Sequence, residues 1–391
     1  MSNVAASDTP APPPAGRAGK ASGFRPTAAE VDLDAIRHNA RAMKPDGVEL
    51  MAVVKADGYG HGAVQAARAA LEAGATWLGV ALIEEAVELR DEGLDTPILV
   101  LSEVPRGAEE GLVQAAVSAS LYTERGLSAL VAAGEATGIA PRVHVKADTG
   151  MHRAGAYPPE RAVDLARRAG EAGFVVEGLW THFARSEDDP VTTKRQLDAF
   201  LDVCRQAESA GVRPRYRHAA NSGAVILHPE THLDLVRVGV ALYGLSPAPG
   251  LGERAGLRPA MAWRSAVSMV RRLPAGEAVS YGHTYRLERD STVATVPVGY
   301  ADGYRRGLSS RADVLIGGRR HRVAGTVTMD QIVVDCGDAD VHEGDEVVLL
   351  GPQGQERITA AELAELLDTI EYEIACGVGA RVPRTYTGGS A

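Results

Sequence analysis

The residues 52–62, AVVKADGYGHG, place a lysine at the end of an apolar run and follow it with alternating glycines. Burial disfavours an ammonium ion, so a lysine that closes a buried strand has a lowered pKa. The neutral amine is the form that makes a Schiff base. Gly58, Gly60 and Gly62 let the backbone turn closely around a ligand before a helix begins. Taken alone, such a lysine more often reaches out to solvent from the strand end.

Two further segments carry groups that could bind an anion or supply a fixed positive charge. Asn221 and Ser222 lie in HAANSGA, at the junction between an apolar run and a helical stretch. A small hydroxyl and free backbone amides at such a junction are good anion ligands, although Asn-Ser-Gly also makes an ordinary turn. Arg237 lies inside the apolar run LVRVGVALYG, and its guanidinium does not give up its proton.

The elements that must position these groups alternate between short apolar runs and amphipathic helices. Each run is apolar on both faces, as in a parallel strand that is buried on both sides. Eight such units predict an α/β fold with a closed (β/α)8 TIM-type barrel, and an open doubly wound sheet is the alternative. Either fold collects functional groups at the carboxyl ends of its strands. The runs are residues 49–55, 77–83, 97–103, 117–123, 142–148, 174–184, 216–221 and 235–244.

The pattern changes near residues 251–259, a loop rich in Gly, Arg and Pro. Short extended runs with Gly and Asp turns follow, which predicts a mostly β domain. One helix is expected over residues 360–368, where Thr359 is a suitable N-cap with Glu362 three residues later. We therefore predict a disordered tail over 1–22, a barrel over 23–255 and a β-rich domain over 256–387.

Composition excludes several classes of protein. The 391 residues are 45% hydrophobic and 24% charged, which suits a globular protein with a large core. The net charge of −10 and the lack of basic runs argue against nucleic acid as a partner. No apolar stretch approaches the roughly 18 residues that span a membrane, and the first residues lack the pattern of a signal peptide.

Cysteines and histidines give no sign of a metal site. Cys204, Cys336 and Cys376 are far apart, which predicts neither a disulfide framework nor paired metal ligands and suits a cytoplasmic location. His228 and His232 are four residues apart, but Pro229 lies between them and the H-E-x-x-H pattern is absent. We expect no bound metal.

The residues 52–62 resemble the attachment motif for pyridoxal 5'-phosphate (PLP) in bacterial alanine racemases, which are fold-type III PLP-dependent enzymes. The resemblance runs from about Pro26 to Tyr386. It implies an enzyme that interconverts L-alanine and D-alanine by a two-base mechanism and supplies D-alanine for cell-wall peptidoglycan. The other matching segments, in order, are residues 146–155, 218–224, 235–244, 278–285, 296–304, 325–331 and 381–384.

The resemblance also implies which residues carry the reaction. Lys55 would hold PLP covalently and act as the base on one face of the substrate. Tyr281 would be the second base, acting across the interface of a homodimer. A phenol ordinarily has a pKa of about 10, so nearby positive charge would have to lower it.

The same resemblance assigns residues to the cofactor and the substrate. Arg237 would face the pyridine nitrogen and keep it unprotonated, and His182 would link Arg237 to Tyr281. Lys146 matches a lysine that is often carbamylated in this family, and the new negative charge would pair with Arg153. The implied cofactor residues are Lys55, Tyr59, His182, Asn221, Ser222, Arg237, Gly239 and Val240, and the implied substrate residues are Arg153, Tyr300, Met329 and Asp330.

One departure from the family pattern lies before RVPR. Many members have a tyrosine there that reaches the phosphate and narrows the substrate entrance, whereas this chain has Ala380. Either the alignment shifts locally or the entrance is wider, which would relax the preference for alanine over serine.

Three other functions compete with racemisation. A PLP carrier without catalytic activity would resemble the barrel alone. A fold-type III decarboxylase would have a Gly-Gly-Gly phosphate loop and a carboxylate at the pyridine nitrogen, where this chain has Arg237. A Schiff-base aldolase without a cofactor would leave the anion-binding segment at Ser222 unexplained.

Overall fold

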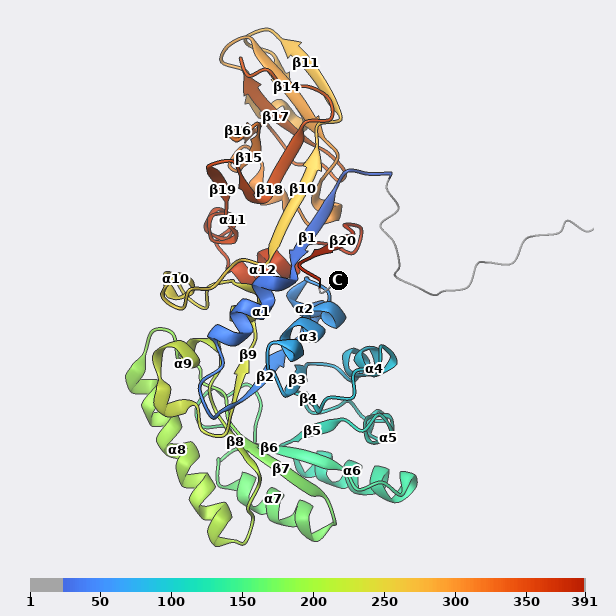
Figure 1. Ribbon diagram of the computed structural model, residues 1–391, viewed down its shortest axis with the longest axis vertical. Coiled ribbons are helices and arrows are strands. Elements are labelled where there is room, and N and C mark those ends of the chain that lie inside the picture. The colour runs from blue at the N-terminus through green and yellow to red at the C-terminus, as the bar shows by residue number, and fades with distance from the viewer. Residues whose placement is uncertain (1–23, 390–391) are drawn as a thin grey trace, which may run out of the picture.

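A computed structural model describes residues 24–389, which fold into a barrel and a β-rich part (Figure 1). The tail predicted over 1–22 lies outside the described residues. In Figure 1 the barrel occupies the lower half of the view, and the C-terminal end of the described chain lies near the place where the two parts join.

The eight predicted strands form a parallel sheet in the order β8-β7-β6-β5-β4-β3-β2-β9. The sheet nearly closes, because β2 pairs with β9 and two backbone hydrogen bonds, Asp234 to Arg217 and Arg237 to Ala220, bridge the edge between β8 and β9. This confirms the TIM-type barrel over the open sheet. The strands are β2 (Glu49–Val53), β3 (Trp77–Val80), β4 (Ile98–Val100), β5 (Ser118–Leu121), β6 (Arg142–Lys146), β7 (Val175–Trp180), β8 (Tyr216–His218) and β9 (Leu235–Val238).

Amphipathic helices cover the outside of the barrel (Figure 1). In α3 the alanines at three- and four-residue steps are buried against the strands, as the sequence pattern predicts. The helices are α1 (Leu33–Ala42), α2 (Lys55–Tyr59), α3 (Ala63–Glu72), α4 (Ile83–Asp91), α5 (Glu109–Gln114), α6 (Glu124–Thr137), α7 (Arg161–Glu171), α8 (Pro190–Ser209) and α9 (Ser222–Leu227), with 3-10 turns η1 (Pro229–Thr231) and η2 (Val240–Tyr243).

The β-rich part is built on a ten-stranded sheet, and the first strand of the chain belongs to it. β1 (Ala28–Asp32) pairs antiparallel with β10 and parallel with β20, although its residues fall in the range predicted for the barrel. The chain therefore starts and ends in this sheet. Its other strands are β10 (Met261–Ala266), β11 (Met269–Leu273), β14 (Ser291–Val296), β15 (Asp313–Ile316), β16 (Arg319–Val323), β17 (Ile332–Gly337), β18 (Glu346–Gln353), β19 (Glu356–Ile358) and β20 (Arg384–Thr387).

The helices after the barrel differ in two respects from expectation. α11 (Ala360–Leu367) begins as predicted, with the Thr359 hydroxyl accepting the Glu362 backbone N–H at 3.0 Å. A second helix, α12 (Glu371–Cys376), was not predicted, and α10 (Leu251–Arg254) occupies part of the expected loop. The remaining elements are a hairpin of β12 (Ala278–Val279) and β13 (Tyr285–Arg286) and the 3-10 turns η3 (Tyr281–His283), η4 (Tyr300–Asp302) and η5 (Arg306–Leu308).

Between residues 24 and 389, no helix combines the length and apolar character needed to cross a membrane.

Candidate active site

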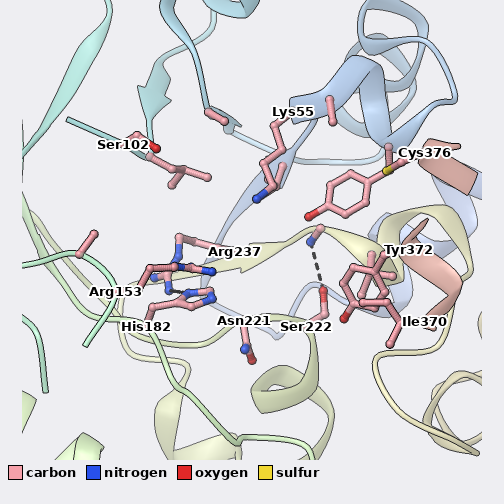
Figure 2. Close-up of a pocket in the computed structure, with 18 of the residues that line it drawn as sticks. Lys55, Ser102, Arg153, His182, Asn221, Ser222, Arg237, Ile370, Tyr372 and Cys376 are labelled. Atoms are coloured by element: carbon pink, nitrogen blue, oxygen red, sulfur yellow. Dashed lines mark hydrogen bonds between the residues drawn. The ribbon is translucent and has the colours of Figure 1, made fainter. Parts of the chain in front are cut away.

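A cavity of about 600 Å³ opens at the carboxyl ends of the barrel strands (Figure 2). It gathers most of the residues that the family resemblance assigned to the cofactor and the substrate. In Figure 2 the Lys55 side chain enters from one side, and His182, Arg237 and Ser222 line the other. The predicted residues that line the cavity are Lys55, Tyr59, Lys146, Arg153, His182, Asn221, Ser222, Arg237, Gly239 and Val240.

Lys55 lies just beyond the buried strand rather than inside it. β2 ends at Val53, and Lys55 begins a turn in which Ala56, Asp57 and Tyr59 have left-handed backbone angles. The Glu85 carboxylate holds this turn by accepting the Ala56 backbone N–H at 2.6 Å. Such conformations cost energy in L-residues and persist only where the surroundings fix them.

Burial lowers the pKa of the Lys55 amine, and the Arg153 guanidinium lowers it further. Glu85 and Cys376 oppose the shift. The pKa of Lys55 is therefore shifted in the direction that the sequence predicts, which favours the neutral amine.

The glycines after Lys55 have a different role from the one that was predicted. Gly58, Gly60 and Gly62 all have positive φ, as a tight turn requires. A Cβ at Gly60 would collide with the Ala375 carbonyl, and one at Gly62 would collide with the Tyr386 hydroxyl. These two glycines make room for the C-terminal segment of the chain rather than for a ligand.

Hydroxyls and a backbone amide converge at one end of the cavity. The Gly239 N–H donates to the Ser222 hydroxyl at 3.1 Å (Figure 2). A Cβ on Gly239 would collide with the Tyr59 hydroxyl, so the absence of a side chain allows this hydroxyl to approach. The Tyr59 ring packs on Tyr243 with ring centroids 5.1 Å apart. Burial raises the pKa of Tyr59, which keeps its hydroxyl protonated as a donor.

Asn221 supports this end of the cavity indirectly. Its side-chain oxygen accepts the Ala224 backbone N–H at 3.0 Å and the Ser186 hydroxyl at 2.7 Å. Asn221 therefore fixes the turn that presents Ser222 and does not present its own acceptor to the cavity.

Arg237 is buried in the barrel, and its guanidinium is held on several sides. It donates to His182 Nδ1 at 3.1 Å, to His218 Nδ1 at 3.0 Å and to the Thr181 carbonyl at 2.8 Å. Burial lowers the pKa of Arg237 to about 9, so it stays charged at neutral pH. Burial and the charge of Arg237 hold the pKa of His182 well below its ordinary value. His182 is therefore neutral, and because Nδ1 accepts, its proton is on Nε2.

Positive charge dominates the cavity. Lys55, Lys146, Arg153 and Arg237 line it, against the carboxylates of Glu187 and Glu373. Burial, with Arg237 and Arg153, lowers the pKa of Lys146 to about 8, and its Nζ lies 4.4 Å from the centre of the Trp180 ring. A site of this kind suits a ligand with more than one negative group.

The remaining predicted residues do not line this cavity. Tyr281 is 75% exposed, Met329 52% and Tyr300 42%. They are grouped on the β-rich part, because Tyr281 lines a shallow pocket with Thr328 and Gln331, and the Tyr300 N–H donates to the Thr328 carbonyl at 3.0 Å. The Asp330 carboxylate in the same turn forms an ion pair with the Arg381 guanidinium at 2.8 Å. Within one chain, Tyr281 and Lys55 belong to different pockets.

The unpredicted helix α12 supplies residues that sequence reasoning missed. Tyr372 and Cys376 of this helix, and Ile370 just before it, line the cavity (Figure 2). Ala380 is exposed and does not line it. A tyrosine is thus present in the cavity eight positions before the place where it was sought. The expectation of a wider entrance at Ala380 is therefore not supported.

Comparisons with known proteins match both the barrel and the β-rich part to one family. The model of the alanine racemase N-terminal domain matches residues 31–247, and that of the C-terminal domain matches residues 260–386. The chain belongs to the alanine racemase family. An alanine racemase of Symbiobacterium thermophilum is 51% identical over 94% of this chain and 99% of its own length. One of Frankia casuarinae is 48% identical over 92% of this chain and 95% of its own length.

Solved structures of alanine racemases share the architecture. The crystal structure of the enzyme from Streptomyces lavendulae has a TM-score of 0.90 and 44% identity, covering 95% of this chain and 99% of that one. Because the C-terminal domain of alanine racemases is matched as well as the barrel, a carrier protein made of the barrel alone is excluded.

Proposed function

We propose that this protein is a PLP-dependent alanine racemase that interconverts L-alanine and D-alanine and supplies D-alanine for cell-wall peptidoglycan. The observation that supports this most directly is the position of the Lys55 amine, which faces a cavity shared with buried Arg237 and the Ser222–Gly239 pair. Family membership gives the reaction class. The three cysteines are free, which favours the cytoplasm as its compartment.

The residues present fit PLP. Arg237 would face its pyridine nitrogen as a fixed donor, and the Ser222 hydroxyl, the Gly239 and Val240 backbone and the Tyr59 hydroxyl would hold its phosphate. Lys55 would carry it covalently. The chemistry that PLP supplies when bound is electron withdrawal from the substrate Cα, which acidifies the proton there.

The side chains of this protein then move that proton. On one face the neutral Lys55 amine would take the proton, and in the reverse direction its ammonium form would return it. On the opposite face the phenolate of Tyr281 of the partner subunit would take the proton and its phenol form would return it. Arg153 would hold the substrate carboxylate together with the partner subunit's Met329, through its backbone N–H, and the turn at the partner's Asp330 and the partner's Tyr300. His182 Nε2–H is free to face Tyr281 of the partner subunit.

A homodimer is part of this proposal. Tyr281, Tyr300 and Met329 are exposed apolar or aromatic side chains on one surface of the β-rich part. Such a group is typical of an interface. Bringing it over the cavity of a second copy would supply the base that a single chain lacks beside Lys55.

The direct test is chiral analysis of the product. Purified protein saturated with PLP and given L-alanine should produce D-alanine until the two are equal, and the same end point should be reached from D-alanine. Serine should react far more slowly than alanine if the Tyr372 ring limits the size of the substrate that fits the cavity. A protein that binds PLP and leaves both enantiomers unchanged would refute the proposed function.

Gly239→Ala should weaken PLP binding about tenfold or more. The added methyl group collides with the Tyr59 hydroxyl, and overpacking of this kind costs about 1–3 kcal/mol. The measurement is the Kd of PLP by fluorescence titration of the apoprotein. Gly170→Ala is the matched control, because a Cβ there meets nothing within 4 Å; equal affinities for the two variants would show that the crowding has no effect on the cofactor.

Lys146 should be carbamylated when carbon dioxide is available. Its pKa of about 8 leaves a useful fraction of neutral amine, and nitrogen attack on CO2 releases a proton and leaves an anion that can pair with Arg153. Protein equilibrated with ¹³C-bicarbonate should show a carbamate signal by ¹³C NMR. The signal should vanish in Lys146→Ala and persist in Lys194→Ala, whose lysine is 71% exposed. A wild-type spectrum without it would remove the assignment.

A further inference from the structure

Asp302 is a fully buried carboxylate in the β-rich part, and the proposed mechanism gives it no role. It ends the 3-10 turn η4 in the segment VPVGYADGY, and its exposed fraction is 0%. One carboxylate oxygen accepts the Gly299 backbone N–H at 3.0 Å. The other forms ion pairs with Arg25 at 2.8 Å and with Arg381 at 3.4 Å. Asp302 therefore connects η4 to the segment before β1 and to the segment after α12.

The turn η4 packs directly on residues 328–331, the carboxylate turn, which is proposed to bind the substrate carboxylate. The Tyr300 N–H donates to the Thr328 carbonyl at 3.0 Å, and the Ala301 N–H donates to the Met329 carbonyl at 3.0 Å. The glycine just before η4 approaches the same two carbonyls so closely that a Cβ on it would lie 2.3 Å from each oxygen. A shift of η4 would therefore displace the backbone of the carboxylate turn.

Arg381 makes a second connection between Asp302 and the carboxylate turn. Its guanidinium forms ion pairs with both Asp302, at 3.4 Å, and Asp330, at 2.8 Å. The Arg25 side chain donates to the Arg381 carbonyl at 3.0 Å, which holds the Arg381 backbone beside this cluster. Because Asp330 directly follows Met329, the carboxylate turn is held at its backbone and at a side chain.

Asp302 also contacts the cavity side of its own chain, but through its backbone. Its carbonyl accepts the Gly379 N–H at 2.8 Å, and a Cβ on Gly303 would collide with the Gly377 carbonyl. These glycines follow α12, which ends at Cys376 in the cavity lining. A substitution of the Asp302 side chain leaves these backbone contacts in place, so its direct effect falls on the carboxylate turn.

We propose that Asp302 is a positioning residue for racemisation, which holds the carboxylate turn in place and serves the cavity of the second copy rather than that of its own chain. It does not touch substrate or cofactor. The Met329 N–H is proposed to bind the substrate carboxylate both before and after the proton moves. Its misplacement should therefore weaken substrate binding more than it slows proton transfer. This inference rests on the proposed function for its kinetic consequences, whereas the hold on the turn is independent of activity.

The first test is the KM of Asp302→Asn for each enantiomer of alanine at saturating PLP. Every polar contact of the Asp302 carboxylate within residues 24–389 is with a donor, so the asparagine amide must place its own NH2 group against one of them. KM should rise about tenfold in both directions, within the range for loss of a residue that orients a ligating group, with kcat within about threefold. An unchanged KM would overturn the proposal.

Glu109→Gln is the matched control for this substitution. Glu109 is also a buried carboxylate that accepts a backbone N–H, from Gly107, and pairs with an arginine, Arg125. It lies on α5 and does not line the cavity. Glu109→Gln should leave both KM and kcat unchanged.

Hybrid dimers decide which cavity Asp302 serves. A dimer of one Lys55→Ala chain and one Asp302→Asn chain, isolated through a different affinity tag on each, has a single site that contains Lys55. That site takes its carboxylate turn from the Lys55→Ala chain, in which Asp302 is intact. The hybrid should therefore show the wild-type KM and about half of the wild-type kcat per dimer. A hybrid KM as high as that of the Asp302→Asn dimer would overturn the proposal, because the effect would then lie within one chain.

Hydrogen–deuterium exchange separates this proposal from the proposed function. In Asp302→Asn, the peptides that contain η4 and the carboxylate turn should exchange at least threefold faster than in wild-type protein, whereas α12 should be unchanged. Wild-type protein without racemase activity refutes the proposed function and leaves this measurement to decide the role of Asp302. Unchanged exchange in the carboxylate turn overturns the positioning role.

Arg381→Ala decides the question if Asp302→Asn does not fold. Arg381 is 47% exposed, so its loss is tolerated more easily than a change at a fully buried carboxylate. The variant keeps the Gly299 contact of Asp302 and removes only the link to Asp330. KM should rise about threefold and return to the wild-type value in a hybrid with Lys55→Ala. An unchanged KM in Arg381→Ala, or a KM that stays raised in that hybrid, would overturn the proposal.

Discussion

Replacing Lys55 with alanine should lower racemisation about 10⁴-fold or more in both directions. The amine is proposed both to carry the cofactor and to move the proton on one face, so the variant loses two functions at once. The matched control is Lys194→Ala, which removes an exposed lysine paired to Asp198 on the barrel surface and should keep full activity.

The measurement is kcat with L-alanine and with D-alanine at saturating PLP, together with covalent trapping by borohydride. In wild-type protein the reduced cofactor should be found on the peptide that contains Lys55, whereas the variant should trap none. A Lys55→Ala variant within tenfold of wild type, or trapping on another lysine in wild-type protein, would contradict the role assigned to this residue.

Replacing Tyr281 with phenylalanine should affect the two enantiomers unequally. The phenol is proposed to act only on the face opposite to Lys55, so removal of the α-proton from L-alanine should fall about 10³-fold, within the range for loss of a general base. Removal from D-alanine, which uses Lys55, should be largely preserved.

The measurement is exchange of the α-proton with deuterium oxide, starting from each pure enantiomer. Tyr157→Phe is the control, because Tyr157 is also exposed, at 61%, but lies on the barrel. Equal losses from both enantiomers in Tyr281→Phe would show that Lys55 and Tyr281 do not divide the two faces between them.

The barrel could be predicted because each of its strands has a recognisable local sequence pattern. Runs such as residues 49–55 and 235–244 are apolar on both faces, and the helices between them show three- and four-residue spacing. The partner of β1 could not be read in this way. Its five residues alternate like any half-buried strand, and only tertiary contacts place them between β10 and β20.

The residues of the cavity could be predicted where they lie in a distinctive sequence motif, as do Lys55, Ser222 and Arg237. It was not predictable where a side chain reaches it from a short helix with no distinctive motif. Tyr372 and Cys376 belong to α12, a helix of six residues whose only signal was a glutamate-rich first turn.

The proposed two-base site depends on where Tyr281 lies. The residue is exposed and lines a pocket other than that of Lys55. The proposed site therefore exists only if a second copy brings its β-rich part over the cavity.

Subunit complementation tests this most directly. Lys55→Ala and Tyr281→Phe proteins, each purified alone, are mixed, dissociated and allowed to reassociate, and conversion of L-alanine to D-alanine is measured. A hybrid dimer contains one site with both residues intact, so the mixture should regain a substantial part of wild-type activity that neither variant shows by itself. A mixture that forms hybrid dimers and yet stays at the level of its parents would show that the two residues do not meet across the interface.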